Sequence, residues 1–264
     1  MNSFILKVFN LILFFVFSAG FAQTNFAVDT LMLKDAKDLF ADDYGNVYLY
    51  RSKDFSFTKY DSVGKQKGKL MLTLPFKVQS VQNPLNIPLF SENAQELKFY
   101  DQYLNEIQTI NFRQKFGQIK MVYAEDLQQI WLLDESMKRL IQYNFREDQM
   151  INSFPFNIEF ENVSDLLVYD GKVYILKQQS FSAYNYKSEK LFEIAVENAK
   201  RLRRENDVIM LITSQSVFQL NSKNLTTLFH DENAKIVDKN STAYFVSKNN
   251  KLYLYPLQKV SDRK

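Results

Sequence analysis

A short pattern recurs at intervals of about 40 residues along most of this chain of 264 residues. Each copy is a run of apolar and aromatic residues that ends in Tyr or Leu, followed by Asp or Asn, and in the last copy by Pro. Successive copies lie 40, 43, 41, 36 and 35 residues apart. Such a period is typical of a β-propeller, in which each repeat forms one four-stranded blade. The six copies end at Tyr60-Asp61, Tyr100-Asp101, Tyr143-Asn144, Tyr184-Asn185, Leu220-Asn221 and Tyr255-Pro256.

A second set of positions supports the same period. Each copy has an aromatic residue or a Met 10 to 12 positions upstream of its Tyr or Leu, a distance that fits two strands joined by a tight polar turn. Asp170-Gly171, between two apolar runs, is a strong hairpin signal by itself. The upstream residues are Tyr48, Phe90, Trp131, Tyr174, Met210 and Tyr244. The predicted strands, from inner to outer, are 37–41, 47–50, 55–60 and 69–74 in the first blade and 163–169, 173–176, 181–184 and 191–196 in the fourth.

The last repeat lacks an outer strand, because the chain becomes polar soon after Tyr255. An unassigned apolar run, residues 26–33, lies near the amino terminus. An open sheet edge would leave amides and carbonyls unpaired, so we expect this run to complete the sixth blade. The predicted fold is therefore an all-β, six-bladed propeller of four-stranded antiparallel blades, closed by the amino-terminal strand.

Residues 1–22 have the layout of a secretory signal peptide. Lys7 is the only charge, an apolar stretch follows over 8–17, and the small residues Gly20 and Ala22 precede the expected cleavage before Gln23. An uncleaved anchor is the alternative, but the apolar stretch is shorter than the roughly 20 residues that a membrane span needs. We predict an exported protein whose single domain, 23–264, has no transmembrane span.

Composition excludes several function classes. With 33 basic and 30 acidic residues, the chain has too little net charge to create a strong field for nucleic acid. It has no Cys and only one His, which excludes metal sites built from thiolates and zinc-dependent hydrolysis, since zinc usually needs several Cys or His ligands. That residue, His230, is followed by Asp231, but neighbours in a strand point to opposite faces and no nucleophile motif accompanies them. No phosphate-binding glycine loop occurs, and no cofactor is expected.

The run 43–49, Asp-Tyr-Gly-Asn-Val-Tyr-Leu, resembles the turn and strand of NHL-type and related bacterial β-propellers, and it is echoed loosely at 126–132 and 170–175. The resemblance implies the architecture and no functional motif. Small exported propellers of this kind are often scaffolds in outer-membrane assembly or protein-secretion complexes. Lactonase-like propellers share the architecture and hold a metal in the central channel, where the candidate ligands here would be Asp38, Asp126, Asp165 and Asp238.

Two groups of residues are candidates for binding a partner. Arg201 and Arg203 would share one face of the inner strand of blade five, and Arg204 would lie on the other face. The paired N–H groups of their guanidinium side chains suit a partner segment that is rich in carboxylates. The alternative is that these arginines lie on a solvated rim of the protein and form internal salt bridges to Glu205 or Asp207. Phe154 and Phe156, which flank Pro155, could form a protein-binding patch; the alternative is that they belong to the blade core.

These observations favour a non-catalytic exported scaffold, a periplasmic or outer-membrane-associated subunit that binds other envelope proteins in an assembly or secretion complex. The absence of a catalytic constellation from the sequence and the closed repeat architecture carry this hypothesis. The alternative is a metal-assisted lactonase-like enzyme or a sugar-binding propeller that uses the central channel. The alternative requires at least three acidic or amide side chains that converge at one depth of the channel.

Overall fold

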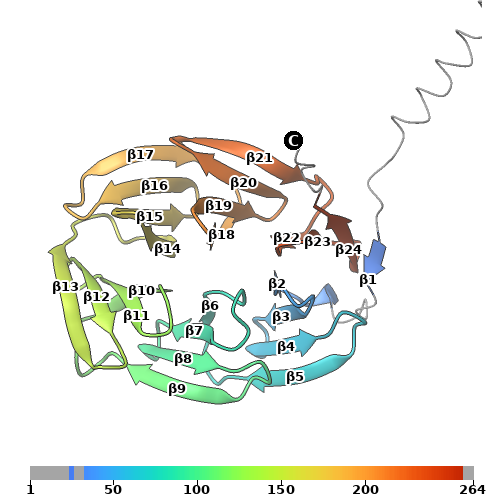
Figure 1. Ribbon diagram of the computed structural model, residues 1–264, viewed down its shortest axis with the longest axis horizontal. Helices are drawn as coiled ribbons and strands as arrows, with labels where there is room; N and C mark the ends of the chain where they lie inside the picture. Colours follow the sequence, from blue (N-terminus) through green and yellow to red (C-terminus); the bar gives the residue numbers. More distant parts are fainter. Residues whose placement is uncertain (1–23, 27–32, 258–264) are drawn as a thin grey trace, which may run out of the picture.

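Six four-stranded antiparallel sheets follow one another around a ring in the computed structural model, which describes residues 24–26 and 33–257 (Figure 1). Each sheet is one blade, and the strands of a blade run in sequence order from the centre of the ring outward in the first five. The chain is therefore a six-bladed β-propeller, as the repeat predicts. Blade 1 is β2 (Asp38–Ala41), β3 (Val47–Arg51), β4 (Ser56–Tyr60) and β5 (Gln66–Met71); blade 2 is β6 (Lys77–Val78), β7 (Ile87–Ser91), β8 (Glu96–Tyr100) and β9 (Glu106–Asn111); blade 3 is β10 (Ile119–Ala124), β11 (Gln129–Asp134), β12 (Arg139–Asn144) and β13 (Gln149–Pro155). Blade 4 is β14 (Val163–Tyr169), β15 (Lys172–Lys177), β16 (Ser180–Asn185) and β17 (Lys190–Ala195); blade 5 is β18 (Ala199–Glu205), β19 (Val208–Thr213), β20 (Ser216–Asn221) and β21 (Asn224–His230); blade 6 is β22 (Ile236–Lys239), β23 (Ala243–Lys248), β24 (Lys251–Pro256) and β1 (Thr24–Phe26).

The ring is closed by the two ends of the chain. β1 pairs antiparallel with β24, with Thr24 opposite Leu254 and Phe26 opposite Leu252, so blade 6 takes its outer strand from the amino terminus. The predicted closure is confirmed, but the predicted strand 26–33 is wrong in its bounds. Leu33 lies in a short helical turn before β2 instead, because its buried side chain packs into the core between blades 6 and 1. Residues 27–32 and the predicted signal peptide lie outside the described residues.

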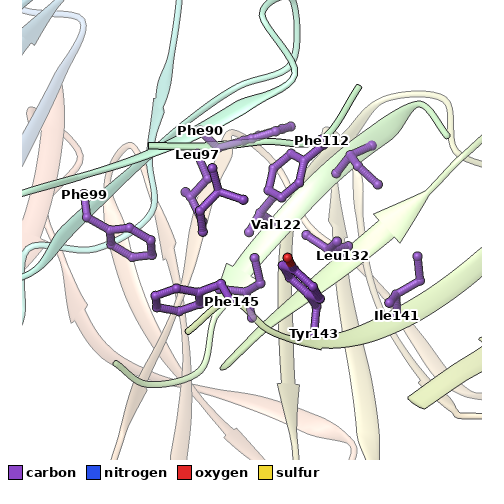
Figure 2. Close-up of a cluster of buried hydrophobic side chains, with 12 residues drawn as sticks. Phe90, Leu97, Phe99, Phe112, Val122, Leu132, Ile141, Tyr143 and Phe145 are labelled. Atoms are coloured by element: carbon purple, nitrogen blue, oxygen red, sulfur yellow. The ribbon is translucent and has the colours of Figure 1, made fainter. Parts of the chain in front are cut away.

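Most of the apolar positions of the repeat are buried between neighbouring blades. One such cluster joins blades 2 and 3, where Phe99 stacks on Phe145 with ring centroids 5.0 Å apart (Figure 2). Of the six upstream residues of the repeat, all are buried except Tyr244, which is half-buried. The period in the sequence therefore reflects the packing of blade on blade, since alternate residues of each strand face the two neighbouring sheets.

Short turns connect the strands, and their sequences explain their shapes. Asp170 and Gly171 join β14 to β15 with positive φ at both residues, 50° and 69°, as the predicted hairpin requires. Asp61 closes another turn by accepting hydrogen bonds from the amides of Val63 and Lys65 at 3.1 and 2.9 Å. Within the described ranges, no helix is both long and apolar enough to span a membrane.

Candidate functional site at the centre of the ring

Charged side chains of the innermost strands meet at the centre of the ring. Arg201, on β18, donates from Nη2 to Asp38 Oδ1 at 2.5 Å and to the Leu39 carbonyl at 2.9 Å. Its guanidinium also lies 4.0 Å from the ring centroid of Phe40, and the residue is only 6% exposed. Since β18 belongs to blade 5 and β2 to blade 1, this contact bridges two blades that blade 6 separates.

A second network surrounds Arg203 and Glu205. Arg203 donates from Nε to Glu205 Oε1 at 2.8 Å and from Nη1 to the Lys239 carbonyl. Lys239 Nζ lies 2.5 Å from the other oxygen of Glu205, and burial lowers the pKa of this lysine. The salt bridge of Arg203 to Glu205 agrees with the alternative interpretation of the arginine cluster, but Arg203 is buried rather than solvated.

A third ion pair crosses the ring between blades 2 and 4. Lys77 Nζ lies 2.8 Å from Asp165 Oδ1 and donates to the carbonyl of Ser164. The second oxygen of Asp165 accepts a hydrogen bond from the amide of Leu202 at 2.6 Å. One buried carboxylate therefore fastens blades 2, 4 and 5 together.

Asp238 is the least satisfied acid of the centre. Its Oδ2 accepts a hydrogen bond from the amide of Ala41 at 2.8 Å, whereas Oδ1 has no hydrogen-bond partner among the described residues and lies 3.9 Å from Arg203 Nη1. Burial raises the pKa of Asp238, while Arg201 and Arg203 act in the opposite direction. The carboxyl is therefore held near two cations without a hydrogen bond from either.

Three of the four candidate metal ligands, Asp38, Asp165 and Asp238, do lie at the centre. Asp126 does not; it is exposed in a turn, where it accepts hydrogen bonds from the amides of Gln128 and Gln129. The carboxylates of Asp38 and Asp165 are already paired with Arg201 and Lys77. Within the described ranges, no group of three or more acidic or His residues could hold a metal ion. The central acids therefore do not fit a metal in this arrangement.

A cavity of about 330 Å³ opens beside this network, between blades 2, 3, 4 and 5. Gln82, on the long connection between β6 and β7, lines it and donates to the Arg204 carbonyl at 3.0 Å, which links blades 2 and 5 across the ring. Arg204 lies with its guanidinium 4.0 Å from the ring of Tyr169. As predicted, it occupies the opposite face of β18 from Arg201 and Arg203, and it is the most exposed of the three.

The two candidate phenylalanines lie between blades 3 and 4. Phe156 has no exposed surface and packs edge-on against Tyr184, with centroids 5.8 Å apart. Phe154 is half-buried and stacks on Tyr186 at 4.7 Å. The expectation that Phe156 contributes to a surface patch is wrong, because the neighbouring blade covers it; the core interpretation describes this residue.

His230 makes one contact that its sequence neighbours do not indicate. This residue ends the outer strand β21, and its Nδ1 lies 2.8 Å from Ser216 Oγ on the neighbouring strand β20. The pairing depends on strand register, and only the alignment of β20 with β21 could have indicated it. Asp231 does not extend the pair, since its carboxylate lies 2.8 Å from Lys248 Nζ and accepts a hydrogen bond from Tyr255.

The six four-stranded sheets arranged in a ring define a six-bladed β-propeller. The chain matches no family model, and no curated protein matches it by sequence. Among solved structures, it is similar to a streptogramin B lyase, with a TM-score of 0.51 and 13% identity over 90% of this chain and 87% of that one. Virginiamycin B lyase from Staphylococcus aureus gives 0.48 and 11%, over 90% and 88% of the two chains, and BamB from Moraxella catarrhalis gives 0.45 and 9%, over 83% and 82%. At these identities, what is shared is the fold.

Proposed function

We propose that this protein is a non-catalytic, exported interaction protein that binds other envelope proteins in an assembly or secretion complex. The observation that carries the proposal is the pairing of charged side chains across the centre of the ring. A catalytic or ligand-binding centre needs side chains that are poised to act on a substrate. Arg201, Arg203 and Lys77 instead hold the central acids to the blades, so the centre acts as a structural fastening.

Two further features support the proposal. A ring of repeats held rigidly at its centre presents broad faces, which suits a protein that binds other proteins. The predicted signal peptide would deliver the chain to the envelope.

The test is affinity purification of the full chain, tagged at its carboxyl terminus, from gently solubilised native envelopes. Defined proteins should co-purify in constant proportion. The matched control lacks residues 2–22, so it should stay inside the cell and should not retrieve the same proteins. If the exported protein elutes as a lone monomer without a partner, the proposal is refuted.

The cavity of about 330 Å³ favours a second candidate, a small polar ligand such as a sugar. Its lining combines amide side chains with Tyr123, and Gln79 Nε2 is buried without a hydrogen-bond partner within the described part of the chain. Hydroxyl-rich ligands use such donors and aromatic surfaces. A sugar panel should then raise the melting temperature of the wild type and not of Tyr123→Ala. No shift with any sugar would eliminate this candidate.

A further inference from the structure

Five large apolar side chains are exposed in turns at one face of blades 1, 2 and 3. We name them the apolar arc. Tyr44 is 74% exposed, Val63 70% and Tyr103 67%. In the corresponding turns of blades 4 to 6 that the structure describes, no large apolar side chain is exposed. The members of the apolar arc are Tyr44, Val63, Leu85, Tyr103 and Leu127.

All five lie at the same face of the propeller. The four strands of a blade alternate in direction, so the turn after the inner strand and the turn after the third strand lie at the same end of the sheet. The apolar arc occupies such turns only. They are 42–46 and 61–65 in blade 1, 79–86 and 101–105 in blade 2, and 125–128 in blade 3.

These turns contact one another or their neighbouring blades. A Cβ at Gly45 would lie 3.7 Å from Ser62 Cβ, which brings the two turns of blade 1 together. Lys59 of blade 1 donates from Nζ to the Gln102 carbonyl of blade 2 at 2.9 Å. In blade 3, Arg146 donates to the Leu127 carbonyl at 3.2 Å and joins the turn 145–148 to the turn 125–128. These contacts link the two turns of blade 1, blade 1 to blade 2, and the two turns of blade 3, and the apolar arc extends over these three neighbouring blades.

The fold does not require apolar residues at these positions. In the turn that Asp101 closes, its Oδ1 accepts hydrogen bonds from the amides of Tyr103 and Asn105, both at 2.8 Å. Asn185 closes a turn of blade 4 in the same way, and Lys187 occupies the place that Tyr103 has in blade 2. Since a lysine serves equally well in the same turn, the exposed tyrosine has no role in the turn itself.

The same turns are strongly acidic. The six turns of this face in blades 1 to 3 are the five turns of the apolar arc and the turn 145–148. They carry seven acidic residues that are at least partly exposed and two basic residues, whereas the described turns of this face in blades 4 to 6 carry three acidic and two basic residues. The acidic residues of blades 1 to 3 are Asp43, Asp61, Asp101, Glu125, Asp126, Glu147 and Asp148, and the basic ones are Lys65 and Arg146. Lys115 and Lys67 form ion pairs with Asp148 and Asp61, so five acidic residues remain against two basic ones and this face keeps an excess of negative charge. A partner that binds here meets exposed apolar side chains surrounded by this charge.

We propose that the apolar arc binds a segment of a partner protein that carries both basic and apolar side chains. This inference rests on the proposed function, since it names the surface and the chemistry of the partner. Apolar contact at Tyr44, Tyr103 and Leu127 supplies the binding free energy, because exposed aromatic side chains are enriched at interfaces. The surrounding carboxylates attract and orient the basic segment, so binding weakens as salt rises.

Cross-linking in the native cell tests the chemistry of the partner. A photoreactive amino acid replaces Tyr103 or Leu127 in the full chain, and Met137, which is 61% exposed at the opposite face, carries the same group in the control. Mass spectrometry then locates the cross-linked peptide of the partner. We expect a peptide with net positive charge and apolar residues at the two arc positions and none at the control position. The inference is overturned if the cross-linked segment is acidic or uncharged, or belongs to a second copy of this chain. It is also overturned if Met137 cross-links as strongly as the arc positions, or if neither arc position cross-links.

A set of variants separates this inference from the proposed function. The triple variant Tyr44→Ser, Tyr103→Ser, Leu127→Ser should recover at least tenfold less partner than the wild type and should keep its melting temperature. The matched control, Leu74→Ser with Met137→Ser, changes exposed apolar residues of the other face and should recover the partner fully. If the wild type and the triple variant recover equal amounts, the inference fails and the proposed function stands. If the wild type recovers no partner, the proposed function itself fails.

Discussion

Replacing Arg201 with Met should cause a large loss of stability, because this buried side chain connects blade 5 to blade 1. The change removes the 2.5 Å ion pair with Asp38 and the hydrogen bond to the Leu39 carbonyl. It also leaves Asp238, which is 1% exposed, without one of its two neighbouring cations. Methionine keeps much of the volume and the apolar stem of arginine, so the loss reports the charge rather than a cavity.

The magnitude follows from burial. Removing one partner of a buried ion pair costs about 3–5 kcal/mol, because the remaining charge is left without compensation. The side chain of Asp38 is 22% exposed, so the remaining carboxylate can recover some hydration, which offsets part of this cost. For a domain of this size, such a loss lowers the melting temperature by about 6–20 °C, at roughly 2–4 °C per kcal/mol.

Urea unfolding and calorimetry of the mature protein measure both quantities, and Lys177→Met is the matched control. Lys177 Nζ lies 3.3 Å from Glu159, whose side chain is 91% exposed. An exposed pair of this kind contributes at most about 1 kcal/mol, so the control should melt close to the wild type. If Arg201→Met and Lys177→Met cost the same free energy of unfolding, the claim that the ring centre fastens the blades is refuted.

Three other perturbations test the fold and the centre. Deleting residues 24–33 removes β1 and Leu33, so it should lower the melting temperature by more than about 10 °C; an unchanged melt would contradict closure by this segment. Gly117→Ala would place a Cβ 1.9 Å from Ser136 Oγ and 2.5 Å from Asp134 Oδ1. Urea unfolding should show that the free energy of unfolding falls by about 1–3 kcal/mol. A fall below experimental error would mean that the neighbouring side chains can move aside without cost. Burial raises the pKa of Asp238, so the folded state favours the protonated carboxyl. The stability gained in this way is present below the ordinary pKa of 3.8 and is lost as the pH rises toward the higher pKa of the folded state. Asp238→Asn cannot ionise, and its stability relative to the wild type should therefore increase from pH 4 to pH 7 in urea unfolding; a constant difference would refute the shift.

Several features of the site were predictable from the sequence because they depend on local geometry. Strand alternation places Arg201 and Arg203 on one face of β18 and Arg204 on the other, as found. The burial of Phe156 was not predictable in this way, because it results from the packing of blade 4 on blade 3. The contact of Ser216 with His230 depends on the register of two strands, which a list of residue types does not contain.

The sequence alone determined the number of blades, the four-strand period and the use of an amino-terminal segment to complete the ring. These features are repeated or local, since each blade needs the same alternation and the same turns, and an unpaired edge needs a partner. Only the tertiary structure decided which charges meet. Arg201 and Asp38 are 163 residues apart and belong to blades that are not neighbours, so their contact exists only after the ring has closed. The same closure turns a cluster of arginines that suggested a docking site into a central fastening, and it leaves the apolar arc as the exposed surface.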